Sequence, residues 1–129
     1  MNFRLRRRAA TLTTVALLTL GGVALATESA SAYTTEWLPN TGHGVGVYTQ
    51  PYSWSQKGPS DLWSSNFDGI LANCWTMGED VAGHGNVWYR VDGVSYAAGT
   101  GGTLWGTWYV YGAYADNFAL FYNHEIPKC

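Results

Sequence analysis

The chain has 129 residues, of which 47% are hydrophobic and only 12% are charged, and its net charge is −2. Low charge together with many glycines and aromatic residues describes a compact folded protein and argues against a disordered chain. From residue 33 onward, three basic residues stand against eight acidic ones, a net charge of −5. This balance argues against nucleic-acid binding, which needs clustered Lys and Arg, and against adsorption to anionic membrane surfaces.

Residues 1–32 have the pattern of a secretory signal peptide. Four arginines between positions 4 and 8 form a basic start, and an uncharged, largely apolar run from Ala9 to Ala26 follows. Ala30-Ser31-Ala32 matches an A-x-A cleavage site, which predicts that the exported chain begins at Tyr33. The sequence therefore predicts a secreted protein, either extracellular or associated with the cell wall.

The same segment fits two other patterns. A membrane anchor is one, since about twenty apolar residues can span a bilayer. The threonines and glycines that interrupt the run, and the small residues after it, favour cleavage instead. Arg7-Arg8 also fits a twin-arginine signal, but an ordinary basic start explains both residues, so the general secretory route is expected.

The chain has two cysteines, Cys74 and Cys129, and Cys129 is the last residue. In an exported domain of this size they are expected to form one disulfide. Closing a loop of that length stabilises the fold by roughly 4 kcal/mol in the chain-entropy model, a large share of the stability of so small a domain. A zinc site is the alternative, but there is no C-x-x-C spacing and the three histidines are scattered.

Residues 33–43 show no hydrophobic periodicity and contain Pro39 and Gly42, which predicts an N-terminal arm or loop. Leu38–Gly42 reads LPNTG and resembles a sortase sorting signal. Such a signal works near a C-terminus, ahead of a hydrophobic stretch and basic residues. Here cleavage would discard the domain itself, so the match is not expected to act as one.

The rest of the chain, residues 44–129, is predicted to be one all-β domain of about five short strands. The predicted strands cover residues 44–48, 61–67, 70–77, 86–91 and 108–111. In the third strand, Ile70, Ala72 and Cys74 share the face that is the better candidate for the core. In the fourth, Val87, Tyr89 and Val91 are predicted to point inward. Five short strands with Gly-rich turns favour a small barrel or a partly open sandwich.

The connections between these strands carry the turn signals. Asp68-Gly69 and Asp92-Gly93 predict tight turns, and residues 93–107, with four more glycines, suggest a hairpin tip or an insertion. Residues 49–60 are rich in Pro, Gly and Ser and predict a long loop. Gly112–Asp116 could form a single turn, and the tail 117–129 is anchored by Cys129.

Four motifs appear in an order that carries a family resemblance. They are GVxVYxxP at Gly44–Pro51, the strand after Asp68-Gly69 that ends in Cys74-Trp75, GxxWYRV at Gly85–Val91, and WYVYGAY at Trp108–Tyr114. This order resembles the bacterial SH3-like domains, and most closely the secreted, single-domain actinobacterial type with its terminal Pro-x-Cys. The resemblance covers residues 44–129 and implies a small SH3-like β-barrel with a peptide-binding face. Two departures, Tyr48-Thr49-Gln50 in place of Arg-x-Gly and the 93–107 insertion, lie where a ligand would contact such a fold.

Nothing in the sequence assembles a catalytic set. His43, His84 and His124 lie in three separate loop-like segments, and Glu79-Asp80 is an adjacent acidic pair in a turn. Neither a G-x-S-x-G nor an H-E-x-x-H motif is present, and a disulfide would occupy both cysteines. No catalytic residue, metal or cofactor is therefore predicted.

The excess of aromatic residues needs an explanation. All seven tryptophans, all nine tyrosines and three of the four phenylalanines follow residue 32, more than a small core can bury. Rigid rings beside Gly/Pro loops suit a groove for peptide or sugar. The candidate groove residues, drawn from the segments that flank the ligand face in SH3-like folds, are Tyr48, Tyr52, Trp54, Trp88, Tyr111 and Tyr114. The alternative is that these rings fill the core, which fits Trp88 and Tyr111 equally well.

The expected function is that of a monomeric, non-catalytic binding module for a cell-wall (peptidoglycan) peptide or another extracellular peptide. A secreted inhibitor or interaction protein that acts through residues 93–107 is the alternative. A small hydrolase that uses His84 or His124 is a third, less favoured, hypothesis.

Overall fold

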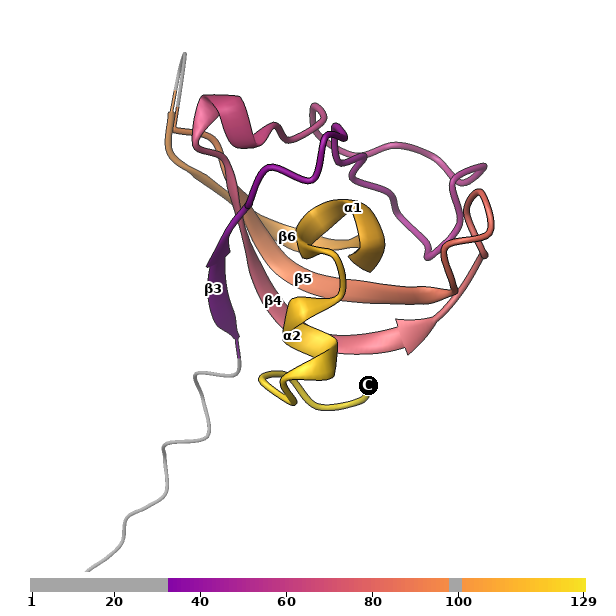
Figure 1. Ribbon diagram of the computed structural model, residues 1–129. Coiled ribbons are helices and arrows are strands. Elements are labelled where there is room, and N and C mark those ends of the chain that lie inside the picture. The colour runs from indigo at the N-terminus through magenta and orange to yellow at the C-terminus, as the bar shows by residue number, and fades with distance from the viewer. Residues whose placement is uncertain (1–32, 98–100) are drawn as a thin grey trace, which may run out of the picture. The chain divides into compact units, whose positions relative to one another are not determined.

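The computed structural model describes residues 33–97 and 101–129 (Figure 1), so the predicted signal peptide lies outside the described residues. Its centre is one antiparallel sheet of four strands in the order β3-β4-β5-β6. The strands are β3 (Thr34–Trp37), β4 (Gly69–Met77), β5 (Val87–Ser95) and β6 (Thr103–Tyr111). A 3-10 helix (Ser64–Asn66) and two short α-helices, α1 (Gly112–Asp116) and α2 (Ala119–Tyr122), complete the regular structure.

The two central strands are those that the sequence predicts best. Ile70 and Ala72 of β4 are buried in the core, as predicted. Cys74 is buried too, but it pairs with Arg90 and not with a core residue, so the prediction that it shares their face is wrong. The register of β4 against β5 is irregular around Ala72, and beyond that point Trp75 packs on the core, where its ring meets the edge of Phe121 at 4.7 Å. Such an irregularity turns side chains that would otherwise alternate strictly.

β5 runs through Asp92-Gly93, so the predicted turn at this position is wrong. The pair forms an irregularity in the β5–β6 register instead. A Cβ on Gly93 would lie 2.9 Å from the carbonyl oxygen of Leu104, so glycine serves the close approach of two strands here. The hairpin bends only after Ser95, and residues 98–100 lie outside the described part. Most of the predicted 93–107 insertion is therefore regular strand.

The predicted arm contains the strand β3, so the prediction of a loop is wrong for residues 34–37. β3 pairs with β4 from Thr34↔Ala72 to Trp37↔Gly69. Along β3, Thr35 and Trp37 are exposed while Thr34 and Glu36 are half-buried. This strand owes its existence to a partner more than thirty residues away, which local periodicity does not reveal.

The predicted strands at 44–48 and 61–67 are reduced to isolated bridges. Val45 pairs with Leu62, and Tyr48 pairs with both Lys57 and Tyr109. Residues 64–66 form the 3-10 helix in place of strand. The irregular segment between β3 and β4 thereby reaches from one edge of the sheet to the other, while the four strands themselves form an open sheet (Figure 1).

The core lies between the sheet and the two α-helices, which Figure 1 shows over one face of it. Val47, Ile70, Val91 and Val110 are fully buried there against Leu120 of α2. α1 coincides with the single turn that the sequence suggests, whereas α2 was not predicted. Within residues 33–97 and 101–129, no helix is long and apolar enough to cross a membrane.

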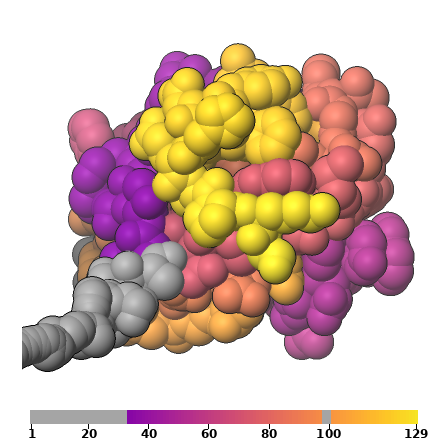
Figure 2. Space-filling model, turned by 90° about the horizontal axis from the view of Figure 1, so that it is seen from below, coloured from indigo at the N-terminus to yellow at the C-terminus, as the bar shows by residue number. Residues whose placement is uncertain are grey.

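The predicted disulfide Cys74–Cys129 is confirmed, with its Cα atoms 5.0 Å apart. It fastens the tail beside β4, where Trp75 donates its N–H to Pro127 at 2.9 Å and accepts the N–H of Cys129 at 2.8 Å. We call this fastened C-terminal tail the strap; its residue Ile126 is buried. Figure 2 shows the tail, in yellow, lying across the surface of the molecule.

Candidate functional site

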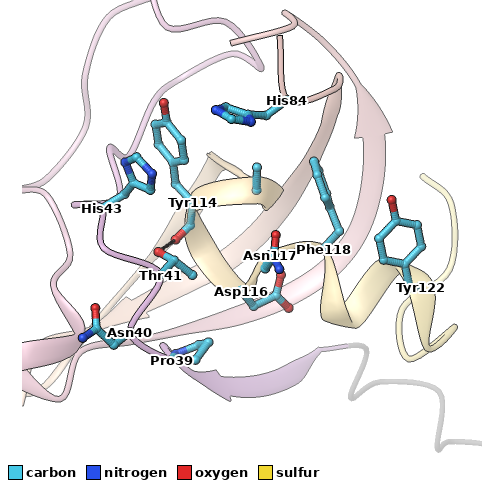
Figure 3. Close-up of a pocket in the computed structure, with 11 residues that line it drawn as sticks. Pro39, Asn40, Thr41, His43, His84, Tyr114, Asp116, Asn117, Phe118 and Tyr122 are labelled. Atoms are coloured by element: carbon cyan, nitrogen blue, oxygen red, sulfur yellow. Dashed lines mark hydrogen bonds between the residues drawn. The ribbon is translucent and has the colours of Figure 1, made fainter. Parts of the chain in front are cut away.

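A hollow lies between the segment 39–43, the loop around His84 and the two α-helices (Figure 3). Its volume is about 820 Å³, within the range of ligand-binding clefts. The side chains that give it its character are Thr41, His43, His84, Tyr114, Phe118 and Tyr122. They come from three segments that are far apart in the sequence: 39–43, the loop around His84, and the two consecutive helices α1 and α2.

Tyr114 of α1 is the centre of this site. The His43 imidazole stacks on its ring, with centroids 4.0 Å apart and planes inclined by 9°. His84 lies beyond the same ring at 6.3 Å and 60°. Thr41 donates its hydroxyl to the Tyr114 carbonyl at 2.8 Å (Figure 3), which ties the 39–43 segment to α1. Tyr114 is half-buried and both histidines are exposed, so ring surface remains open to a ligand.

Tyr111 packs against Tyr114 from the interior of the protein. It is 3% exposed, its ring meets the edge of Tyr114 at 5.1 Å, and its hydroxyl donates to the Gly85 carbonyl at 2.6 Å. Burial raises the pKa of the Tyr111 phenol, so the hydroxyl stays a donor. This bond attaches the loop that contains His84 to Tyr111, the last residue of β6.

The buried carboxylate of Asp116 builds the helical side of the hollow. It accepts hydrogen bonds from the Tyr89 hydroxyl at 2.7 Å and from the N–H groups of Ala119 and Leu120 at 3.1 and 2.9 Å. Burial raises the pKa of Asp116, while these donors oppose the shift. Satisfying the first N–H groups of α2 is the role of a helix cap, so Asp116 positions α2.

The turn between the two helices is made by residues in the left-handed region. Asn117 has a φ of 56° and Phe118 a φ of 64°. Two successive non-glycine residues in this region are uncommon and carry strain of order 1–3 kcal/mol each. The turn directs Phe118 toward the hollow (Figure 3). Its ring meets Tyr111 at 6.2 Å and Tyr122 at 5.8 Å, which extends the aromatic lining.

The structure connects four of the six predicted groove residues through their rings. Tyr48 meets Trp88 at 5.8 Å, Trp88 meets Tyr111 at 5.3 Å, and Tyr111 meets Tyr114. Trp88 is fully buried and Tyr111 nearly so. Neither ring can contact a ligand directly, so the core-filling alternative describes both. Of this series, only Tyr114 lines the hollow.

Tyr52 and Trp54 form a separate pair on the 49–60 loop, which projects at the lower right of Figure 2. Their rings stack in parallel at 4.8 Å, and Trp54 is 76% exposed. Between them, Ser53 donates its N–H and its hydroxyl to one oxygen of Glu79, at 2.6 and 2.5 Å. These bonds lower the pKa of Glu79. Glu79 thus anchors the loop, and its backbone carbonyl also accepts the Trp88 indole N–H at 2.8 Å.

Of the six side chains that give the hollow its character, the sequence predicted only Tyr114 as a groove residue; it missed Thr41, His43, His84, Phe118 and Tyr122. The two histidines stand in Gly-rich loops with no spacing that relates them, and α2 is too short for a helical period to register. His124, by contrast, does not line the hollow. The LPNTG segment forms one wall, with Leu38 buried and Thr41 bonded to Tyr114, so the folded chain does not present it as a free extended strand.

The site offers stacking and hydrogen bonding in place of a nucleophile–base pair. Both cysteines are in the disulfide. Across the described residues, no three His, Cys, Asp or Glu side chains are grouped to hold a metal ion. Comparison with protein-family models, curated proteins and solved structures gives no match for this chain, so the interpretation of the site rests on its own geometry.

Proposed function

We propose that this chain is an exported, non-catalytic binding module that holds an extracellular peptide, with a cell-wall stem peptide as its ligand, in the hollow around Tyr114. The observation that carries the proposal is the ring cluster of His43, Tyr114, Phe118 and Tyr122 along one open hollow. Rigid aromatic side chains provide contact area at little cost in conformational entropy, which suits recognition of short flexible ligands.

The polar groups of the hollow fit a peptide backbone. Asn40 and Asn117 lie on its rim and are exposed, and each amide can both donate to and accept from a peptide bond.

Export and an SH3-like barrel belong to the same proposal. The disulfide is compatible with an oxidising compartment, and the A-x-A site ahead of Tyr33 supplies the route. The bridges from Tyr48 to Lys57 and to Tyr109, beyond the edge of β6, support a sheet that is partly wrapped in the manner of a small barrel.

The test is retention of residues 33–129 on purified peptidoglycan, followed by calorimetric titration with a soluble stem peptide. Tyr114→Ala removes the ring on which His43 stacks, and we expect it to weaken binding by roughly tenfold or more. Trp54→Ala, in the separate loop pair, shows whether that pair contributes. If the unmodified chain binds neither probe, or if Tyr114→Ala folds and binds as well as the parent, the proposal fails.

A further inference from the structure

A second aromatic surface lies on the face of the sheet that points away from the helices. Residues that are directly opposed on paired strands share a face of the sheet. Two such rows of opposed residues point to the same face: Thr35–Leu71–Gly93–Trp105 and Trp37–Gly69–Ser95–Thr103. The row between them contains Ile70 and Val94, which point into the core. Trp37 and Trp105 therefore stand on the outer face, with two glycines between them.

The glycines let both indoles lie against the sheet. A Cβ on Gly69 would be 2.7 Å from the Trp37 ring, and a Cβ on Gly93 would be 3.3 Å from the Trp105 ring. Gly69 and Gly93 are diagonal neighbours on adjacent strands, which places them roughly 7–8 Å apart. The two indoles thus lean from opposite edges toward the middle of the sheet, close enough for one short ligand to touch both.

Tyr33 completes the surface. Its ring meets the edge of Trp105 at 5.7 Å. Leu71, which stands on the same face between the strands that carry these rings, is only 7% exposed, as expected if the rings cover it. Trp37 and Trp105 nevertheless remain 59% and 61% exposed. We define this set, Tyr33, Trp37 and Trp105, as the sheet platform.

The lack of charge and the small area of the platform indicate which class of ligand it can bind. Its two rows contain no charged residue in a domain of net charge −5, while Thr35 and Thr103 add exposed hydroxyls. A peptide with charged groups, an anionic membrane or a nucleic acid would find no counter-charge here. The exposed fractions correspond to roughly 250–400 Å² of open aromatic surface, about half or less of the ~800 Å² per partner in a stable dimer.

We propose that the sheet platform binds an uncharged glycan chain, whose sugar rings stack their C–H faces on Trp37 and Trp105. Aromatic faces carry negative electrostatic potential and attract the weakly positive C–H hydrogens that a pyranose presents on its apolar side. The threonine hydroxyls are placed to bond with the sugar hydroxyls at the rim. This surface is separate from the hollow around Tyr114, and the inference does not depend on the peptide proposal.

Chitohexaose and insoluble chitin are suitable probes because they contain sugar and no peptide. We expect the unmodified residues 33–129 to be retained on chitin, and Trp37→Ala and Trp105→Ala each to weaken chitohexaose binding roughly tenfold. Met77→Ala is the matched control, since Met77 is an equally exposed apolar residue at the far end of β4. Tyr114→Ala should bind chitohexaose normally, which separates this surface from the proposed peptide site.

The outcome that overturns the inference can be read from the parent protein alone. Absence of any retention on chitin and of any chitohexaose titration refutes it, even if a variant fails to fold. So does binding that both tryptophan variants keep while circular dichroism shows them folded. A third outcome is that sedimentation shows a dimer, that Trp37→Ala disrupts this dimer, and that no sugar binds. This outcome would assign the platform to self-association and refute the proposal that it binds a glycan.

Discussion

The strap formed by the C-terminal tail makes a quantitative prediction about stability. The disulfide joins residues separated by 55 positions. In the chain-entropy model a loop of this size stabilises the folded state by about 4 kcal/mol at 25 °C, through the restriction of the unfolded chain. A domain of this length has a total stability of roughly 5–15 kcal/mol. We therefore expect the double variant Cys74→Ser/Cys129→Ser to lose a large part of its free energy of unfolding.

The native contacts of the tail add a separate contribution. Ile126 is 5% exposed, and the two backbone hydrogen bonds with Trp75 are independent of the sulfur atoms. Ile126→Ala with the disulfide intact should cost about 2–4 kcal/mol, because it leaves a cavity. If the disulfide acts mainly on the unfolded chain, the serine variant keeps these contacts and stays folded at low temperature.

Urea unfolding followed by tryptophan fluorescence measures both effects. The parent protein in reducing agent is the control for the serine substitutions and should lose the same free energy. The slope of free energy against urea should rise in the serine variant, since an unfolded chain without the cross-link exposes more surface. A loss below about 1 kcal/mol, in both the variant and the reduced parent, would contradict the chain-entropy argument.

Three further predictions concern groups that hold the hollow and the 49–60 loop in place. Tyr89→Phe removes a donor to the buried Asp116 carboxylate and should cost about 1–3 kcal/mol in urea unfolding; a smaller loss would mean that water replaces the phenol. The pKa of Glu79 is lowered by its bonds to the preceding loop, so its contribution to stability is present above the ordinary pKa of a glutamate and is lost as the pH falls through the lowered value. Glu79→Gln should therefore weaken the fall of Tm between about pH 5 and 3, and an unchanged profile would exclude this role. Gly78→Ala would bring a Cβ within 2.2 Å of the Pro51 carbonyl oxygen, and we expect it to lower Tm by several degrees; an unaltered Tm would show that the loop moves aside freely.

The parts of the fold that follow local rules were predictable. β4 and β5 carry long apolar stretches, and the buried face of Ile70 and Ala72 follows from alternation alone. The disulfide follows from a count of two cysteines in an exported chain. These features follow from the hydrophobicity of single side chains and from the pairing of two cysteines, both of which can be read from the sequence.

The predictions that failed concern segments whose structure does not follow from local composition or periodicity. Asp92-Gly93 has the composition of a turn, yet it is part of a strand because Gly93 must admit the carbonyl of Leu104. β3 exists because β4, more than thirty residues away, offers it an edge. α2 is only four residues long, and its first N–H groups bond to the Asp116 carboxylate. A four-residue helix is too short for a helical period to show in the sequence.

The candidate site was predictable as a type but not residue by residue. An excess of aromatic rings indicates that some are at the surface, but not which. Trp88 is buried because Tyr48, Tyr111 and the carbonyl of Glu79 surround it. Trp54 lies in the 49–60 loop and is exposed. His43 belongs to the hollow only because Thr41 fastens its segment to α1.

The tail has a consequence for the behaviour of the protein at high concentration. Beyond the short strand β3, the edge of β4 would present the unpaired N–H and C=O of Trp75, which is the kind of template on which strands of other molecules add. Pro127 and Cys129 occupy both groups, and Cys129 is exposed while Cys74 is buried. Because Cys129 is exposed, a reducing agent can reach the disulfide without unfolding of the core. The cross-link therefore protects the folded protein from aggregation by strand addition, in addition to its effect on unfolding.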